Sequence, residues 1–436
     1  MIFKHFPKPT NEGSPQGYSG DGLRANSGSA LVTVMIIMIS VTILAVVGTQ
    51  FIMTSFKDAK RQLNMSAQAE NVARAGLADT IAWFKRQQIQ PVKMRGAMTY
   101  PDEAFNPKFS TDSAKCDTID ESVGLVKEYP LSENNILWAR YEVRKQTAPP
   151  AAIDPFAVHD VTGERLSSGE VNGDGYVWFI PSKGYIYRRK DPNVAFNVSP
   201  NEIIGSAKVS TEIRRITLNL PVTCANIVNN GGTAGSQTVR VNSRGRIVGG
   251  TYGCGRTSGV VPVVSGANAQ VSPPAGPPLA DNYTEQFVLG VTKNELRVLA
   301  DFYVSSVNDL PNPLPDLALI YINGNAVFNA ARPLRGSGLL YVDGNLTLTS
   351  TAGSSPPTSH FFSGFIYVSG NVIIQDPAYV GGCLVSYGGL TLSRAAPADF
   401  AEIIYDQNAL NIVRQQICQY REMKSLNRIF TGVKDY

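Results

Sequence analysis

The sequence predicts an α+β protein in which a long N-terminal helix packs on an antiparallel sheet. A mostly β distal region with a C-terminal helix is expected to follow. Three observations predict this class: an uncharged apolar stretch at 29–53, alternating apolar and polar runs between 136 and 220, and a repeated Gly-containing motif between 320 and 392. Long apolar runs, period-two alternation and internal repetition are the signals of these three kinds of structure.

The first element is the stretch Ser29–Met53, SALVTVMIIMISVTILAVVGTQFIM, inside a charge-free interval between Arg24 and Lys57. As a helix it reaches about 38 Å, because each residue adds about 1.5 Å. The hydrocarbon core of a bilayer is about 30 Å thick. The stretch therefore predicts a membrane-spanning helix.

The helix is expected to continue beyond the membrane to about residue 90. The segment Phe56–Gln88 has no proline, and Pro91 ends it. A periodic apolar stripe predicts that one side of this part packs on a folded domain. The stripe consists of Leu63, Ala67, Leu77, Ile81 and Phe84.

Residues 1–28 form a polar leader rich in Gly, Ser, Asn and Pro. This composition cannot build a core and predicts disorder. Its small positive excess favours a cytoplasmic location. A secretory signal would have a shorter apolar region and a small-residue cleavage site behind it, so the sequence is not typical of one.

These features together resemble the N-terminus of a known family. A leader ending in Gly28, a small Ser29, an unbroken apolar helix and the amphipathic SAQAENVARAGLADTIAWF are similar to type IV pilins, specifically PilX-like minor pilins, over about residues 20–90. The resemblance implies that a prepilin peptidase cuts between Gly28 and Ser29 and methylates the new amine. It also implies insertion in the inner membrane, other major and minor pilins as partners, and a final location in an extracellular pilus.

Thr33 departs from the family, because most pilins have glutamate five residues into the mature chain. That carboxylate is thought to neutralise the terminal amine of a neighbouring subunit, since an unpaired ion in hydrocarbon is costly. A subunit with nothing above it does not need the carboxylate, so Thr33 favours a tip-located subunit. Gly48, which weakens a helix by about 1 kcal/mol relative to alanine, indicates local melting, a close packing contact or no special role. The filament-packing residues implied are Ser29, Leu31, Thr33, Gly48 and Phe51.

Composition bounds the rest of the chain. Only 17% of residues are charged, whereas there are 39 glycines and 27 prolines, which indicates β-rich, turn-rich exported domains. The net charge of +4 is too small to predict a specific nucleic acid partner. The length of the chain after the helix suits two compact domains. The expected parts are a pilin-like αβ domain at 91–221, a Gly/Pro-rich insert and linker at 222–283, and a repeat β domain at 284–436.

All five cysteines follow the membrane span and would lie in an oxidising compartment. Sequence does not fix their pairing. Disulfides between Cys224 and Cys254 and between Cys383 and Cys418 would each close a loop of about 30 residues and contribute about 3 kcal/mol. Cys116 would remain unpaired. No CxxC or histidine cluster accompanies them, so neither a metal nor another cofactor is predicted.

The pilin-like domain begins with a long irregular segment at 91–135 and continues as a sheet. Its expected strands are Ile136–Lys145, Tyr176–Pro181, Gly184–Arg189 and Ala207–Leu220. The helix stripe would cover the apolar face of this sheet. The core should contain the three tryptophans, Trp83, Trp138 and Trp178. The segment VNGDG at 171–175, near Asp160 and Glu164, predicts a turn rather than a calcium site, because the terminal glutamate of a calcium loop is absent.

In the insert, arginines are the only charged residues between Glu212 and Asp281. A basic surface of this kind binds DNA or acidic glycans, although a solvated loop face is the favoured interpretation. The arginines are Arg214, Arg215, Arg240, Arg244, Arg246 and Arg256. The Pro-rich segment 262–278 predicts an extended connector.

A helix should restart at Thr292, where Thr292 and Glu295 have capping-box spacing and Val291 and Leu296 can form a hydrophobic staple. A second helix is expected from Asp399 to about residue 421, with Asp399 and Glu402 at the same spacing. Its apolar stripe contains Ile403, Leu410, Val413, Ile417 and Tyr420.

Between these helices lies an internal repeat of two short strands joined at a Gly-Asn corner. The copies are IYINGNAVF at 320–328, LYVDGNLTL at 340–348, IYVSGNVII at 366–374 and VSYGGLTL at 385–392. Positive φ at the corner glycines, 324, 344, 370 and 388, would favour such corners. Stacked units bury a core that one unit cannot, so the repeat predicts a short parallel β-helix; a sandwich of hairpins is the alternative.

No catalytic constellation stands out, and an enzyme is not predicted. The three histidines are scattered, and Asp343 and Asp376 occupy different points of their repeats. The sequence therefore predicts a minor type IV pilin that assembles near a filament tip and acts in adhesion through its distal β domain, with surface glycans or other surfaces as candidate ligands. A secretion pseudopilin and a membrane-anchored polysaccharide-acting enzyme are the alternatives.

Overall fold

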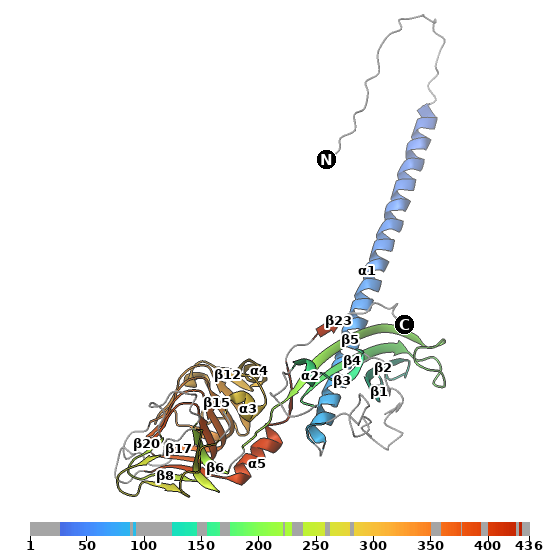
Figure 1. Cartoon of the computed structure of the whole chain (residues 1–436). Helices are drawn as coiled ribbons and strands as arrows, with labels where there is room; N and C mark the ends of the chain where they lie inside the picture. The colour runs from blue at the N-terminus through green and yellow to red at the C-terminus, as the bar shows by residue number, and fades with distance from the viewer. Residues whose placement is uncertain are drawn as a thin grey trace, which may run out of the picture. The chain divides into compact units, whose positions relative to one another are not determined.

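The computed structural model describes residues 27–87, 90–92, 124–145, 155–165, 175–220, 223–228, 239–257, 262–279, 283–349, 359–375, 377–393, 400–423 and 427–429. The chain divides into two compact units, Met1–Leu63 and Asn64–Tyr436. Residues 1–26 of the predicted leader and residues 93–123, which include Cys116, lie outside the described residues. Figure 1 gives the element labels used below.

The first element is α1, a continuous helix of 60 residues at Ser27–Arg86. It ends just before the predicted break at Pro91. In the second unit the helix buries a stripe against a sheet, made of Ala69, Val72, Ala73, Leu77, Trp83 and Phe84. Leu77 and Phe84 confirm the predicted stripe and Ile81 packs at its edge, but Leu63 and Ala67 are exposed, so the prediction is wrong for those two.

The sheet that receives α1 has seven strands in the order β1-β2-β3-β4-β5-β22, with β23 also paired to β5. All pairs are antiparallel except β2 with β3. The strands are β1 Gly124–Pro130, β2 Leu137–Lys145, β3 Ala157–Asp160, β4 Val177–Arg188, β5 Glu202–Arg215, β22 Tyr420–Glu422 and β23 Asn427–Ile429. A short helix α2, Thr162–Arg165, follows β3.

Four details of this sheet differ from the sequence prediction. The two strands expected at 176–181 and 184–189 are the single strand β4, and β1 lies within the segment expected to be irregular. β5 begins before Ala207 and ends at Arg215. β3, in a segment where no strand was predicted, pairs with both β2 and β4. The three tryptophans are buried as predicted: Trp83 of α1 and Trp178 of β4 share one cluster, and Trp138 lies in a separate cluster.

The remaining strands form a ten-stranded and a six-stranded sheet whose pairs are all parallel. The larger sheet has the order β11-β8-β21-β19-β17-β15-β13-β12, with β6 and β9 joined at β19, and the smaller has the order β10-β7-β20-β18-β16-β14. The smaller sheet's strands are β7 Val239–Val241, β10 Val263–Val264, β14 Ala326–Phe328, β16 Leu346–Leu348, β18 Val372–Gln375 and β20 Leu390–Ser393. The larger sheet's strands are β6 Cys224–Val228, β8 Gly245–Val248, β9 Tyr252–Arg256, β11 Gln270–Ser272, β12 Phe302–Val304, β13 Ala318–Ile322, β15 Arg335–Val342, β17 His360–Val368, β19 Ala378–Ser386 and β21 Ala401–Tyr405. We refer to both sheets together as the strand stack.

The repeats lie in register, so that Ile320, Leu340, Ile366 and Leu384 follow one another across the larger sheet. The two strands of each repeat belong to different sheets, which does not match the hairpin alternative. Aliphatic side chains from both sheets pack between them. Only the first corner glycine, Gly324, has positive φ. A Cβ at Gly344 would lie 2.6 Å from the Gly324 carbonyl carbon, so close stacking, rather than positive φ, requires glycine at this second corner.

The segment at 222–283 contributes strands to the same two sheets. β7 pairs with β20, and β8 pairs with β21. β10 and β11 lie within 262–278, so the prediction of an extended connector there is wrong.

Three helices cover the outer face of the larger sheet: α3 Glu285–Leu289, α4 Lys293–Leu299 and α5 Gln407–Gln416. They pack on a row of stacked rings formed by Tyr321, Tyr341 and Tyr367. The predicted capping box of Thr292 and Glu295 is confirmed. A short 3-10 helix η2, Val307–Asp309, contributes Val307 to the core between the sheets.

The C-terminal helix differs from its prediction. Residues 401–405 form β21, because Ile403 continues the register of Val380 in the larger sheet. α5 is shorter than expected, and its N-cap is Asp406 rather than Asp399. After α5 the chain returns to the first sheet, where Tyr420 of β22 pairs with Arg215 of β5. The whole strand stack is therefore an insertion, at 216–419, between two neighbouring strands.

Candidate functional site

The first half of α1 presents an apolar surface on all sides. Leu31 is 66% exposed and Phe51 is 74% exposed. Within the described residues, one helix is long and apolar enough to cross a membrane, and it is this one. No part of the first unit's helix between Leu31 and Leu63 is buried by the rest of the chain.

The apolar surface also carries several serine and threonine hydroxyl groups, and each of those described below donates a hydrogen bond within the helix. Ser40 donates to the Ile36 carbonyl at 2.8 Å, and Thr42 donates to the Met38 carbonyl at 2.7 Å. Thr49 and Thr54 make the same bond one turn back along the helix. Because these bonds close inside the helix, the surface can enter lipid or a bundle of apolar helices without an unsatisfied polar group.

The predicted assembly residues lie on this helix but form no localised site. Gly28 and Ser29 lie in the first turn of α1, where the structure describes the backbone alone. Leu31, Thr33 and Phe51 are exposed. A Cβ at Gly48 would have no atom within 4 Å, so this glycine makes no close packing contact within the chain.

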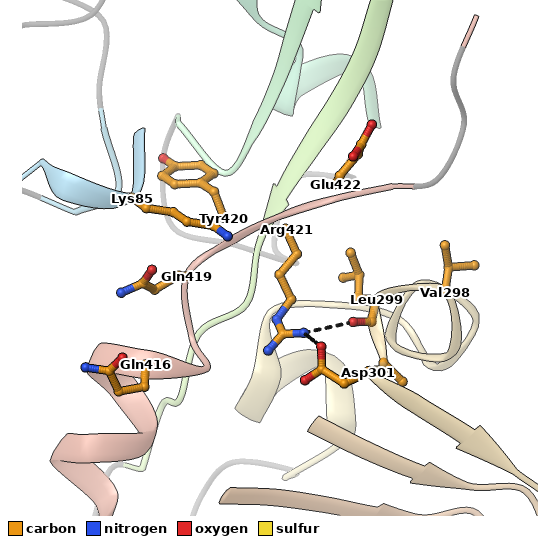
Figure 2. Close-up of a pocket in the computed structure, with 10 residues that line it drawn as sticks. Lys85, Val298, Leu299, Asp301, Gln416, Gln419, Tyr420, Arg421 and Glu422 are labelled. Carbon is orange, nitrogen blue, oxygen red and sulfur yellow. Dashed lines mark hydrogen bonds and ion pairs between the residues drawn. The ribbon is translucent and has the colours of Figure 1, made fainter. Parts of the chain in front are cut away.

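A pocket of about 470 Å³ lies where the strand stack meets the first sheet. Figure 2 shows its lining from the ends of α1, α4 and α5 and from β22. Arg421 donates to the Asp301 carboxylate at 2.6 Å and to the Leu299 carbonyl at 3.2 Å. Lys85 and Glu422 add one charge of each sign, so the pocket has no net charge preference.

Tyr420, beside this pocket, was predicted to lie on a helix and instead lies in β22. Its hydroxyl accepts a hydrogen bond from the Val92 amide at 2.9 Å and donates to the Gly175 carbonyl. Its ring packs on Phe84 of α1 with ring centroids 5.2 Å apart. Burial raises the pKa of Tyr420, which keeps the hydroxyl protonated as a donor.

The arginines of the insert do not share one surface. Arg214 is almost fully buried and donates to the Gly290 carbonyl at 2.7 Å. Arg246 pairs with Glu402 at 2.8 Å, and Arg256 donates to the Gly276 carbonyl. Arg214 therefore fixes the stack to the first sheet, Arg215 lies beside it on β5, and Arg240, Arg244, Arg246 and Arg256 occupy separate positions in the stack.

The remaining candidate groups have structural contacts. His360 is buried, accepts from the Leu334 amide at 3.0 Å and lies 3.1 Å from the Thr349 carbonyl, and burial lowers its pKa. Asp343 pairs with Lys293 at 2.6 Å. Asp160 accepts from the Gly175 and Thr162 amides, and residues 171–174 of the predicted turn lie outside the described residues. Asp376 lies outside the described residues. No group of three or more potential metal ligands occurs in the described part of the chain.

The predicted disulfides are wrong. Cys224, Cys254, Cys383 and Cys418 are buried as thiols, and no disulfide joins them. Cys224 and Cys254 belong to different hydrophobic clusters, on opposite sides of the larger sheet. Cys383 and Cys418 lie in the same hydrophobic cluster, where both are free thiols. Burial raises the pKa of Cys224 and Cys418 to about 12, so these thiols are also poor nucleophiles.

We expect the four buried thiols to resist alkylation in the native chain. In a Cys116→Ser variant, iodoacetamide at pH 8 should modify none of them before unfolding and all four after unfolding in urea without reductant, because burial removes both access and thiolate character. Intact-mass spectrometry gives the number of labels. Fewer than four labels on the unfolded, unreduced chain would reveal a disulfide and contradict the structure.

Comparison of the chain with protein-family models, curated proteins and solved structures gave no match. Its own geometry offers an exposed apolar helix surface, a sheet that buries the later part of the same helix, and an inserted strand stack.

Proposed function

We propose that this chain is a minor, tip-located type IV pilin of PilX-like type and is not an enzyme. It inserts once in the inner membrane, a prepilin peptidase cuts it between Gly28 and Ser29, and it joins other pilins in an extracellular filament. The observation that carries the proposal is α1 itself. This one helix has an apolar first part exposed on every side and a later part that packs on an antiparallel sheet.

The surface chemistry of the first part supports transfer from lipid to a helix bundle. Both environments are apolar, so the helix exchanges one for the other at little cost in desolvation. The hydroxyls of Ser40, Thr42 and Thr49 are bonded within the helix and need no partner in either place. Thr33, where pilins resembling this chain have glutamate, favours a position with no subunit above it.

The strand stack supports a role in presentation at the tip. Its parallel pairs and in-register repeats support the proposal of a short parallel β-helix, a fold that exposes long regular faces. We propose that this domain contacts surface glycans or other surfaces in adhesion. A secretion pseudopilin would have the same kind of α1. Deletion of the gene for this chain distinguishes the two: impaired protein export indicates a pseudopilin, and impaired attachment indicates a pilin.

Maturation at Ser29 tests the proposal. The full chain, expressed in a host with a prepilin peptidase and recovered from membranes and from sheared surface fibres, should begin at N-methylated Ser29 by peptide mass spectrometry. Gly28→Val should retain Met1 and be missing from the fibre fraction, while the matched leader variant Gly22→Val should mature normally. An intact Met1 in the fibre fraction, or no fibre association at all, contradicts the proposal.

A further inference from the structure

The outward face of the six-stranded sheet is a regular, solvent-exposed strip that the rest of the described chain leaves uncovered. In β14, β16, β18, β20 and β7 an outward side chain lies between two residues that are buried between the sheets, whereas both residues of β10 are exposed. Val327 is 51% exposed, Ile373 is 39% exposed and Val263 is 52% exposed. The full row, in register order, is Val327, Thr347, Ile373, Thr391, Arg240 and Val263.

A second row of exposed side chains, the corner asparagines Asn325, Asn345 and Asn371, flanks the first. The Asn325 side-chain oxygen accepts from the Asn345 amide at 2.8 Å, and that of Asn345 accepts from the Asn371 amide at 2.8 Å. Asn371 in turn accepts from Gly389 at 2.8 Å. Each carboxamide is thereby oriented by the next repeat, with its oxygen occupied and its NH₂ group left as the available donor.

These amide nitrogens donate to no other group within the part of the chain that the structure describes. Neighbouring strands are about 4.8 Å apart, so the row offers aligned donors at a constant spacing. Beside it, the methyl groups of Val327, Thr347, Ile373 and Thr391 supply an apolar surface across four neighbouring strands. We define the two rows together as the amide face.

The low charge of the amide face limits the class of ligand that it can bind. Arg240 is the one charged residue in the first row, and the second row has none. On the other side of the first row, Gln375 and Ser393 are paired and also uncharged. Nucleic acids and acidic polymers depend on several cationic contacts, which this face does not provide. A neutral ligand with repeated oxygen acceptors and apolar C–H surface is complementary to it.

The dimensions of the amide face select a narrow ligand. Six strands span about 24 Å along the stack, and three residues span about 10 Å across it, which gives a few hundred Å². A stable protein–protein interface needs about 800 Å² on each partner, so a second copy of this chain is a poor fit. A single extended polymer chain matches the strip.

We propose that the amide face binds one chain of a neutral polysaccharide, which lies along the stack and crosses β14, β16, β18, β20, β7 and β10. The carboxamide NH₂ groups of Asn325, Asn345 and Asn371 donate to its hydroxyl and ether oxygens. Its C–H surface packs on Val327, Thr347 and Ile373. This inference rests on the proposed adhesive function and names its surface and ligand class.

The test uses the detergent-solubilised full chain and a panel of polysaccharides: cellulose, chitin, amylose and dextran as neutral members, and alginate as an acidic one. We expect binding to at least one neutral member, with a Kd that changes less than about twofold between about 50 and about 500 mM salt. In the double variant Asn345→Asp and Asn371→Asp, the retained oxygens still accept the backbone amides while the NH₂ donors are lost. Its Kd should be weaker by at least about tenfold.

Asn411→Asp on α5 makes the same chemical change on an exposed helix elsewhere and should bind as the unmodified chain does. Equal melting temperatures of the variants confirm that the fold is kept. Four results would overturn the proposal: no binding to any neutral member, salt-sensitive binding to alginate alone, a double variant that binds normally, or self-association that the double variant abolishes. Maturation at Ser29 is measured in a separate experiment. If polysaccharide binding fails, the proposed pilin function still stands. If maturation at Ser29 fails, that result does not explain polysaccharide binding.

Discussion

Replacing Gly382 with alanine should destabilise the chain by several kcal/mol, a large part of the 5–15 kcal/mol typical of a folded domain. Gly382 has φ +132°, and a Cβ there would lie 1.8 Å from the Gly364 carbonyl oxygen. Gly338, Gly364 and Gly382 occupy the same register position in β15, β17 and β19, and all have positive φ. Relief of the clash would require the backbones of adjacent strands to separate. Urea unfolding of the solubilised full chain, followed by circular dichroism, measures the loss.

Two other glycines serve as controls that distinguish the cost of backbone strain from the cost of a steric clash. Gly324 has φ +115° but no atom within 4 Å of a built Cβ, so Gly324→Ala should cost only about 1–2 kcal/mol of conformational strain. Gly163 has open space and no positive φ, so Gly163→Ala should change stability by no more than about 0.5 kcal/mol. Equal losses for Gly382→Ala and Gly324→Ala would show that the strands do not approach as closely as described.

Tyr420→Ala should be the second most damaging change, with a loss of about 3–5 kcal/mol. The ring is fully buried between α1 and the first sheet, and its removal leaves a cavity against Phe84 and Trp178. Tyr420→Phe removes only the hydroxyl that joins Val92 to Gly175 and should cost about 1–3 kcal/mol, because the Val92 amide is left buried without its acceptor. The same urea titration ranks both variants.

Tyr303 provides the comparison for Tyr420, since it is 44% exposed on β12. Tyr303→Ala should cost about 1 kcal/mol or less, mainly from its contact with the Tyr321 ring. If Tyr420→Ala were no worse than Tyr303→Ala, β22 would not be part of the first sheet.

The helices and strands that a short segment of sequence specifies by its own residue pattern could be predicted. The apolar run that begins α1, the alternation that gives β2 and the Gly-Asn repeats that give β13 to β18 each carry their period within a short segment. The candidate assembly helix was predictable for the same reason. Pairings between distant segments were not, because nothing near Tyr420 records that its partner is Arg215.

Individual errors have the same origin. Ile403 and Tyr420 fit a helical stripe by spacing, yet the register of Val380 places the first in β21, and β5 holds the second in β22. Asp399 and Asp406 are both acceptable N-caps, and only the preceding strand decides between them. The cysteines were paired by loop length alone, which cannot report that Cys224 and Cys254 lie in different clusters.

The return of the chain at Tyr420 has a mechanical consequence. The peptide bonds that leave and re-enter the first sheet follow Arg215 and precede Tyr420, which are paired residues on adjacent strands about 5 Å apart. A pull on the strand stack is therefore shared by two covalent tethers side by side, and rotation about any one bond cannot let the stack swivel. A single nick by a protease within the insertion would leave both fragments attached to the first sheet, so the stack would stay in place under tension.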